Sequence, residues 1–227
     1  MTLLRLSGGT DVAGIAIFDI DALSASRPED STLVALEESG RLIRFPTGGD
    51  GGYLLHLFVD EPIPEDLQRY CLAEDTLTGG FKTEQGNIAF GGIESAFVGF
   101  KPNRNIRADG AIPPGEYSYT AFHTEFPDEL VTRTLEVEAN STEVWLSRAP
   151  VVVSLATIAL AVALSAAQRF ALVGLALLVG YFAVKLICKA PAYQDIKSRR
   201  EVAQLDLPSI VVELRPAPAR VTLQACR

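Results

Sequence analysis

The residues that could take part in chemistry are few and lie far apart in the sequence. The chain has two histidines, His56 and His123, and both fall in segments that we expect to be strands. A zinc site needs three or four ligands at suitable spacings, and no cluster of cysteine and histidine supplies them. The two histidines could still form a small site if they met across a sheet. Otherwise the sequence predicts neither a metal site nor a cofactor.

Acidic residues offer two further candidates. The loop at residues 60–66 could gather oxygen ligands for calcium, but two prolines stiffen it and its last two acids suit the first turn of a helix. Glu94 follows two glycines, so its carboxylate could project from a turn, yet acid–base catalysis would need a second group at a defined distance. The sequence also lacks the nucleophile patterns of hydrolases and the Gly-Lys-Ser/Thr ending of a phosphate-binding loop. We therefore expect no catalytic residues and a protein that is not an enzyme.

A long apolar run says more about the protein than these candidates do. It covers 38 positions, residues 151–188, and is broken near its middle by Gln168 and Arg169. One helix of this length would reach about 57 Å at about 1.5 Å per residue, whereas the hydrocarbon core of a bilayer is about 30 Å thick. The sequence therefore predicts a transmembrane hairpin of two helices, residues 151–167 and 170–188. The alternative is a hairpin buried inside a soluble protein, but neither segment shows a polar face.

Small, aromatic and basic residues indicate how such a hairpin would pack and sit in a membrane. Small side chains let two helices approach closely, within one hairpin or between two copies, so a homo-oligomer is conceivable. The candidate helix-packing residues are Ala159, Ala163, Ala176 and Gly180, with Ala167 and Ala183 extending the two rows. Aromatic and basic residues gather where a membrane meets water. The candidate membrane-interface residues are Trp145, Arg148, Tyr181, Lys189 and Tyr193.

Charge around the hairpin predicts its orientation. A hairpin returns both flanks to one side, and those flanks are rich in lysine and arginine, whereas the short turn carries only Arg169. Because basic flanks stay in the cytoplasm, we expect a two-span membrane protein with both termini cytoplasmic. The start of the chain shows no secretory signal or transit peptide. Three scattered cysteines suit a reducing compartment.

The residues before the hairpin indicate strands separated by turns. Short β-rich runs at 13–18, 52–59 and 116–125 are bounded by turn residues. Residues 132–139 alternate between polar and apolar, the pattern of an antiparallel strand with one wet face. We expect one helix, at 65–75, which begins after Pro64.

The chain after the hairpin also reads as β structure. Two strand-like runs, 209–215 and 220–226, would be marginal as an isolated β-hairpin, so we expect them to complete the sheet begun earlier. The predicted fold is mainly β: an antiparallel, sandwich-like cytoplasmic domain with an inserted two-helix transmembrane hairpin. Its parts would be an acidic β-rich domain at 1–147, the hairpin at 151–188, and a basic juxtamembrane segment with the C-terminal β-hairpin at 191–227.

Charge separates the two ends of the chain and narrows the possible functions. Residues 1–150 carry 11 basic and 24 acidic residues, a net charge of −13, and residues 151–227 carry 9 and 4, a net charge of +5. An acidic domain is a poor candidate for binding nucleic acid and a better one for a basic protein. The leading hypothesis is a membrane-anchored, protein-binding module, such as an immunity-type protein that neutralises a basic toxin. Glu136 and Glu138, on the polar face of the strand expected at 132–139, are candidate contacts with this partner.

Two other hypotheses remain open. The β domain could sense a small ligand, with hairpins that assemble and perturb the bilayer. Alternatively, the chain could be an accessory structural subunit of a larger membrane complex, with its hairpin packed against neighbouring helices.

Overall fold

The computed structural model describes residues 2–103, 106–137 and 141–217. The chain forms two compact units, a β unit (Met1–Phe126 with Pro208–Arg227) and a helical unit (Pro127–Leu207). The β unit contains, in chain order, β1 (Thr2–Thr10), β2 (Gly14–Asp19), η1 (Ile20–Ala22), α1 (Asp30–Glu38), β3 (Leu42–Pro46), β4 (Gly51–Val59), α2 (Glu65–Gln68), η2 (Ala73–Asp75), β5 (Leu77–Thr83), β6 (Asn87–Gly92), η3 (Ile93–Ser95), β7 (Arg107–Ala111), β8 (Gly115–His123) and, after the helical unit, β9 (Ile210–Pro216). The helical unit contains α3 (Asp128–Val137), α4 (Ser141–Ala166), α5 (Phe170–Lys189) and α6 (Pro191–Gln204). With 32% strand, the protein is mixed α/β rather than mainly β.

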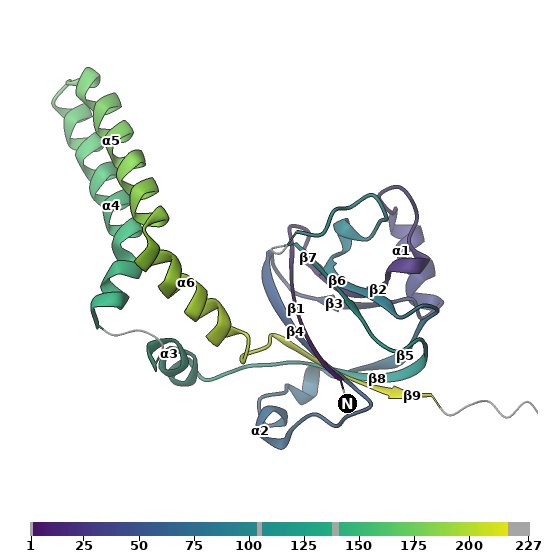
Figure 1. The fold of residues 1–227 in the computed structure, drawn as a ribbon. Coiled ribbons are helices and arrows are strands. Elements are labelled where there is room, and N and C mark those ends of the chain that lie inside the picture. The colour runs from purple at the N-terminus through teal and green to yellow at the C-terminus, as the bar shows by residue number, and fades with distance from the viewer. Residues whose placement is uncertain (1, 104–105, 138–140, 218–227) are drawn as a thin grey trace, which may run out of the picture. The chain divides into compact units, whose positions relative to one another are not determined.

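The β unit is built from two sheets packed face to face (Figure 1). The first has five strands in the order β1-β4-β9-β8-β5, and the second has four in the order β3-β2-β6-β7. The pairing of β4 with β9 is parallel, so the five-stranded sheet is mixed rather than antiparallel as expected. Large apolar side chains from both inner faces fill the space between the sheets, among them Ile17 and Phe45 from one sheet and Leu57 and Val212 from the other. Each such side chain contributes about 1.5–3 kcal/mol through its removal from water.

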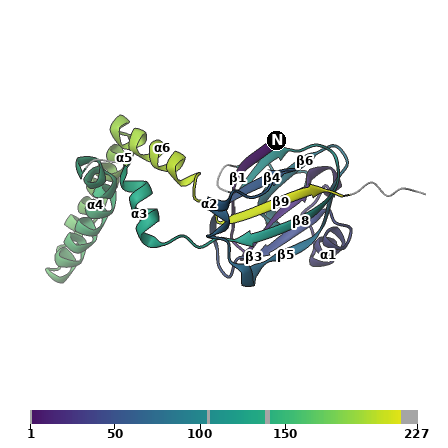
Figure 2. The same cartoon turned by 90° about the horizontal axis from the view of Figure 1, so that it is seen from below.

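The strand after the helical unit lies inside the five-stranded sheet. β9 pairs with β4 on one side and with β8 on the other, with Val212 opposite both Leu57 and Ala121 (Figure 2). The chain segments on the two sides of the insertion are held together, since the backbone N–H of Thr124 donates to the carbonyl of Ser209 at 3.1 Å. The helical unit therefore takes the place of a hairpin loop between two adjacent antiparallel strands. The second strand expected after the hairpin, at 220–226, lies outside the described residues.

The helices differ from the sequence prediction: α1 and α6 were not expected, and two expected elements take another form. The prediction of a strand at 132–139 is wrong. Residues up to Val137 belong to helix α3, and residues 138 and 139 lie outside the described part of the chain. Pro127 starts this helix by accepting from the N–H groups of Leu130 and Val131, and Asp128 and Glu129 fill its first turn, where negative charge is favoured. These signals outweigh the alternation that follows them.

The helix expected at 65–75 is also shorter than predicted. α2 ends at Gln68, and the chain then turns toward the five-stranded sheet. There Cys71 forms a β-bridge with Thr124, and the N–H of Leu72 donates to the carbonyl of His123 at 2.9 Å. These bonds hold residues 71 and 72 beside the end of β8, so the α-helix does not continue to residue 75.

Candidate membrane hairpin and surface grooves

Helices α4 and α5 form an antiparallel hairpin (Figure 1). The break predicted at Gln168 and Arg169 is the turn between them. α4 ends in a Schellman motif: the N–H of Arg169 donates to the carbonyl of Leu164 at 2.9 Å and that of Gln168 donates to the carbonyl of Ser165 at 3.0 Å. Gln168 adopts the left-handed conformation that this motif requires, with φ +55°. The polar tip thus satisfies carbonyls that a plain helix end would leave without partners.

The two helices meet most closely at Gly180. A Cβ atom added there would lie 2.9 Å from Cβ of Thr157 and still closer to its terminal atoms, so only glycine fits. Ala176 and Ala183 of α5 line a groove with Thr157 and Leu160 of α4. On α4 the structure differs from the prediction. Its contact face is formed by half-buried or buried residues, namely Val153, Thr157, Ala161 and Leu164, whereas Ala159 and Ala163 are exposed.

The contact at Gly180 leads to a prediction with a matched control. Gly180→Leu should separate the helices, because its side chain has no room against Thr157. Gly174→Leu adds the same side chain on the same helix, but a Cβ at Gly174 meets nothing within 4 Å. In detergent micelles, cross-linking of cysteines introduced on the facing sides of α4 and α5 should therefore fail for Gly180→Leu and persist for Gly174→Leu. Equal cross-linking in the two variants would contradict this packing.

The serine and threonine hydroxyls within the hairpin bond to carbonyls of their own helix. The hydroxyl of Ser154 donates to the carbonyl of Pro150 at 2.8 Å, that of Thr157 to Val153 at 2.7 Å, and that of Ser165 to Ala161 at 2.9 Å. Each acceptor lies four residues earlier on the same helix. A hydroxyl bonded in this way needs no partner from water, so these three side chains leave no unsatisfied donor when hydrocarbon surrounds them.

The outer surface of the hairpin is apolar. The candidate spans Glu143–Ala166 and Phe170–Lys189 are long and apolar enough to cross a membrane, and 6% of the most apolar stretch of each is buried. Leu155, Val162 and Leu186 are 62%, 64% and 71% exposed. The described residues of this chain therefore do not bury the hairpin, in contrast to the alternative of a core hairpin in a soluble protein. An exposed apolar surface of this kind is typical of contact with lipid or with another protein.

Two cations mark one end of the apolar surface. Since Thr157 lies against Gly180, Arg148 and Lys189 are each nine residues from this contact and lie at the same level of the antiparallel pair. Each is also 20 residues from its side of the turn at Gln168 and Arg169, which corresponds to about 30 Å of helix. This length matches the hydrocarbon thickness of a bilayer. The hairpin thus has basic residues at both ends of a span of membrane thickness.

The candidate interface aromatics do not all lie at this level. Trp145 is 68% exposed and lies three residues before Arg148 on α4, which starts earlier than the sequence indicated. Tyr193 lies in the first turn of α6, just beyond Lys189. Tyr181 lies eight residues before Lys189, about 12 Å further along the apolar surface, and the amine of Lys185 lies 5.6 Å from the centre of its ring.

Helix α6 is tied to the first turns of α4. Nη2 of Arg199 donates to Oε1 of Glu143 at 2.6 Å, and Nη1 of Arg200 donates to the hydroxyl of Ser147 at 3.1 Å. Ile196 of α6 and Ala149 of α4 are buried. Two of the basic residues that flank the hairpin are therefore engaged within the protein.

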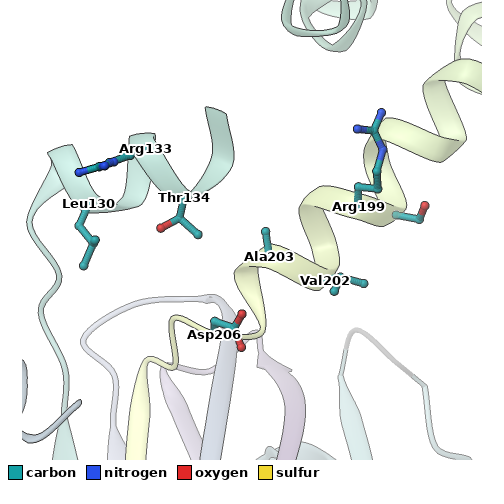
Figure 3. A pocket seen from close by; sticks show the side chains of 8 residues that line it. Leu130, Arg133, Thr134, Arg199, Val202, Ala203 and Asp206 are labelled. Atoms are coloured by element: carbon teal, nitrogen blue, oxygen red, sulfur yellow. The ribbon is translucent and has the colours of Figure 1, made fainter. Parts of the chain in front are cut away.

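A groove of about 550 Å³ lies between α3 and α6. Figure 3 shows Leu130, Arg133 and Thr134 on α3, Arg199, Val202 and Ala203 on α6, and Asp206 just beyond the end of α6. The guanidinium groups of Arg133 and Arg199 extend away from each other rather than toward a common point. The groove therefore lacks the convergent polar groups that catalysis or tight binding of a small molecule requires.

A second groove, in the β unit, is acidic. It measures about 620 Å³ and lies beside the ends of β3 and β8 and the start of β5. Glu74, Asp75 and Glu125 line it together with His123, and none of its lining residues is a lysine or arginine. Such a groove suits a positively charged partner better than an anion.

The two histidines do not form a joint site. In the register of the sheet, His56 of β4 lies opposite Val211 of β9, whereas His123 of β8 lies opposite Ile210. Neighbouring residues of a strand point to opposite faces, so the two imidazoles lie on different sides of the sheet. His123 contacts Phe45 edge-on between the sheets, and His56 contacts Phe58 on the other face. Sequence alone could not show this, because it does not give the register.

The remaining chemical candidates have structural roles. Oε1 of Glu94 accepts from the N–H of Asp11 at 3.0 Å and Oε2 accepts from the hydroxyl of Thr10 at 3.3 Å, which holds the turn after β1. In the acidic loop at 60–66, Ile63 is buried and its N–H donates to Glu213. No group of three or more potential metal ligands occurs among the described residues. Burial raises the pKa of the Cys71 thiol, which disfavours the reactive thiolate.

The other buried charges hold the β unit together. Asp19 is fully buried and accepts from Arg41, which also bonds to Glu84. Arg107 is 3% exposed, bonds to Asp109 at 2.7 Å and donates to the carbonyl of Ser95 at 3.1 Å. Burying these charges is tolerated because each has a partner.

Comparison with known proteins gives little information about the chain. No family model matches it and no curated protein matches its sequence. A solved structure described as "Crocagin biosynthetic gene J" is 12% identical over 54% of this chain and 75% of that one, with a TM-score of 0.38. ComJ from Bacillus subtilis, an inhibitor of the DNA-degrading activity of NucA, is 16% identical over 55% and 82%, with a TM-score of 0.30. Both scores are below 0.5, so neither likeness supports a conclusion about this protein.

Proposed function

We propose that the protein is a membrane-anchored binding module, in which the α4–α5 hairpin spans a bilayer and the acidic β unit captures a basic protein. The proposal of a membrane anchor rests on the structure of the hairpin. Its length between charged ends matches a bilayer, its outer surface is apolar, and its hydroxyls bond within their own helices. Alkaline carbonate extraction of membranes tests this part: the full-length chain should stay in the pellet, and recovery in the supernatant would refute the anchor.

We further propose that both termini face the cytoplasm. Three cations, Arg148, Lys185 and Lys189, lie near the open end of the hairpin. The opposite end, at the turn, has Arg169 alone. This asymmetry favours an orientation with the open end in the cytoplasm. The β unit would then act on partners in the cytoplasm, close to the membrane surface.

The charge of the β unit supports the capture of a basic protein. Residues 1–126 carry 9 basic and 19 acidic residues, a net charge of −10, and three of the acids line the groove beside β3 and β8. Opposite charge speeds association and selects among partners. A toxin neutralised as it reaches the membrane is one partner of this kind. Glu136, in α3 rather than in a strand, and Glu138, outside the described residues, remain candidate contacts.

Neutralising the acidic groove tests capture. The triple variant Glu74→Gln, Asp75→Asn and Glu125→Gln removes three charges from the groove. A matched triple, Glu29→Gln, Asp30→Asn and Glu38→Gln, removes three exposed charges around α1. We expect purified full-length chain in detergent to bind a basic protein partner more slowly in the first variant than in the second. Raising the salt from 0.15 M to 1 M, which shortens the screening length from about 8 Å to about 3 Å, should abolish the difference.

Other outcomes would favour the remaining hypotheses. Equal binding by both triple variants would remove the groove from the proposal. Co-purification with membrane subunits that is independent of salt would favour a structural subunit. Assembly of hairpins that makes vesicles leak would favour a ligand-sensing effector.

A further inference from the structure

We propose that the open end of the hairpin binds the headgroups of anionic phospholipids through Arg148 and Lys189. The inference rests on the proposed membrane anchor and adds the class of lipid that the anchor selects. It follows from the position of the two cations relative to the apolar surface and from the different roles of the neighbouring arginines.

The two cations lie where phosphate groups of a lipid leaflet would lie. Arg148 of α4 and Lys189 of α5 share one level of the antiparallel pair, because each is nine residues from the contact between Thr157 and Gly180. From this level each helix continues for about 30 Å to the turn, and its surface is apolar apart from Lys185. A hairpin that spans the hydrocarbon core therefore brings both side chains to the same headgroup layer.

Both cations are available to a lipid. Arg148 and Lys189 are exposed on the surface of the helical unit. Arg199 and Arg200 on α6 are instead directed to Glu143 and Ser147 of α4. The basic flank of the hairpin thus divides into arginines that fasten α6 to α4 and cations that face the surroundings.

Lys185 extends the cationic surface toward the membrane interior. It lies one turn before Lys189 on the same helix, is exposed, and places its amine beside the ring of Tyr181. A long lysine side chain can reach the headgroup layer from this depth. Three cations from two helices thus lie within about one helical turn of a single lipid layer.

The expected result is enrichment of anionic lipid around the protein. The electrostatic attraction of one basic residue to an anionic membrane surface is enough to enrich anionic lipids around it about fivefold. Full-length protein should be inserted into nanodiscs of equal parts phosphatidylcholine and phosphatidylglycerol, and the lipids that remain bound on extraction should be counted by native mass spectrometry. We expect phosphatidylglycerol to exceed phosphatidylcholine several-fold. Arg148→Gln with Lys189→Gln should lower the ratio, and adding Lys185→Gln should bring it close to one.

A matched variant controls for net charge. Arg27→Gln with Arg133→Gln also removes two exposed cations, neither of which belongs to the hairpin. This variant should keep the preference for phosphatidylglycerol. Loss of the preference in both double variants, or its absence in the unchanged protein, would overturn the inference.

The experiment separates failure of the inference from failure of the anchor. If the anchor is correct, all variants insert into nanodiscs of phosphatidylcholine alone and resist carbonate, whatever their lipid preference. A chain that inserts but binds both lipids equally would refute the headgroup site and leave the anchor intact. A chain that does not insert into either bilayer would refute the anchor itself.

Discussion

A chain in which residues 127–207 are replaced by a short loop containing Asn-Gly should be recovered as a soluble, folded monomer. The full-length chain should instead remain in the membrane pellet at alkaline pH. The reason lies in the connection of β8 to β9, which are adjacent and antiparallel, with Thr124 and Ser209 joined by a backbone hydrogen bond of 3.1 Å. A loop of a few residues suffices to join two such strands.

Removal of the helical unit should leave the core of the β unit intact. The inner faces of both sheets are filled by residues outside 127–207. Carbonate fractionation, size-exclusion chromatography and circular dichroism would compare the shortened and full-length chains. A shortened chain that aggregates would show that the β unit depends on the helical unit for folding, and one that folds but stays with membranes would show a second membrane contact.

Val212→Asp should unfold the β unit. Val212 is fully buried at the centre of β9, opposite Leu57 of β4 and Ala121 of β8. An unpaired carboxylate at such a position costs several kcal/mol, which is comparable with the whole stability of a small domain, about 5–15 kcal/mol. Limited proteolysis of the purified full-length chain should therefore cut residues 2–103 rapidly in this variant and slowly in the unchanged protein.

Ser118→Asp provides the control for this substitution. Ser118 lies on the adjacent strand β8, opposite Arg215, and its side chain is exposed. The same carboxylate at this position stays in water and should change the free energy of unfolding by less than about 0.5 kcal/mol. If Val212→Asp resists proteolysis as well as Ser118→Asp does, β9 is not required for the sheet.

The sequence predicted the local elements of the β unit better than their arrangement. The runs at 13–18, 52–59 and 116–125 correspond to β2, β4 and β8 within one or two residues at each end. Their alternation and turn residues are local signals, which sequence carries directly. The parallel pairing of β4 with β9, and the central place of β9, arise from contacts between segments about 150 residues apart. No local pattern specifies these contacts.

The same distinction applies to the candidate sites. Small residues spaced four apart were evident on α4, but only the rotation of the helix shows that Thr157 and Ala161 face α5 while Ala159 and Ala163 do not. The partners of Arg199 and Arg200 were equally hidden, because Glu143 and Ser147 lie more than 50 residues away on another helix. By contrast, the sequence does indicate that Arg148 and Lys189 lie at one level of the hairpin. This level follows from the position of the turn, which the sequence did predict.

The place of β9 in the sheet has a consequence for the order in which the protein is made. During synthesis β4 and β8 emerge before the helices, and the strand that joins them is still 87 residues away when β8 is finished, from His123 to Ile210. At about 5–20 residues per second, this interval lasts on the order of 4–17 s. The apolar hairpin is translated within it. The hairpin therefore leaves the ribosome while the five-stranded sheet is still divided into two parts, and the β unit closes only afterwards. If the hairpin is the membrane anchor that we propose, it can insert before the β unit is complete.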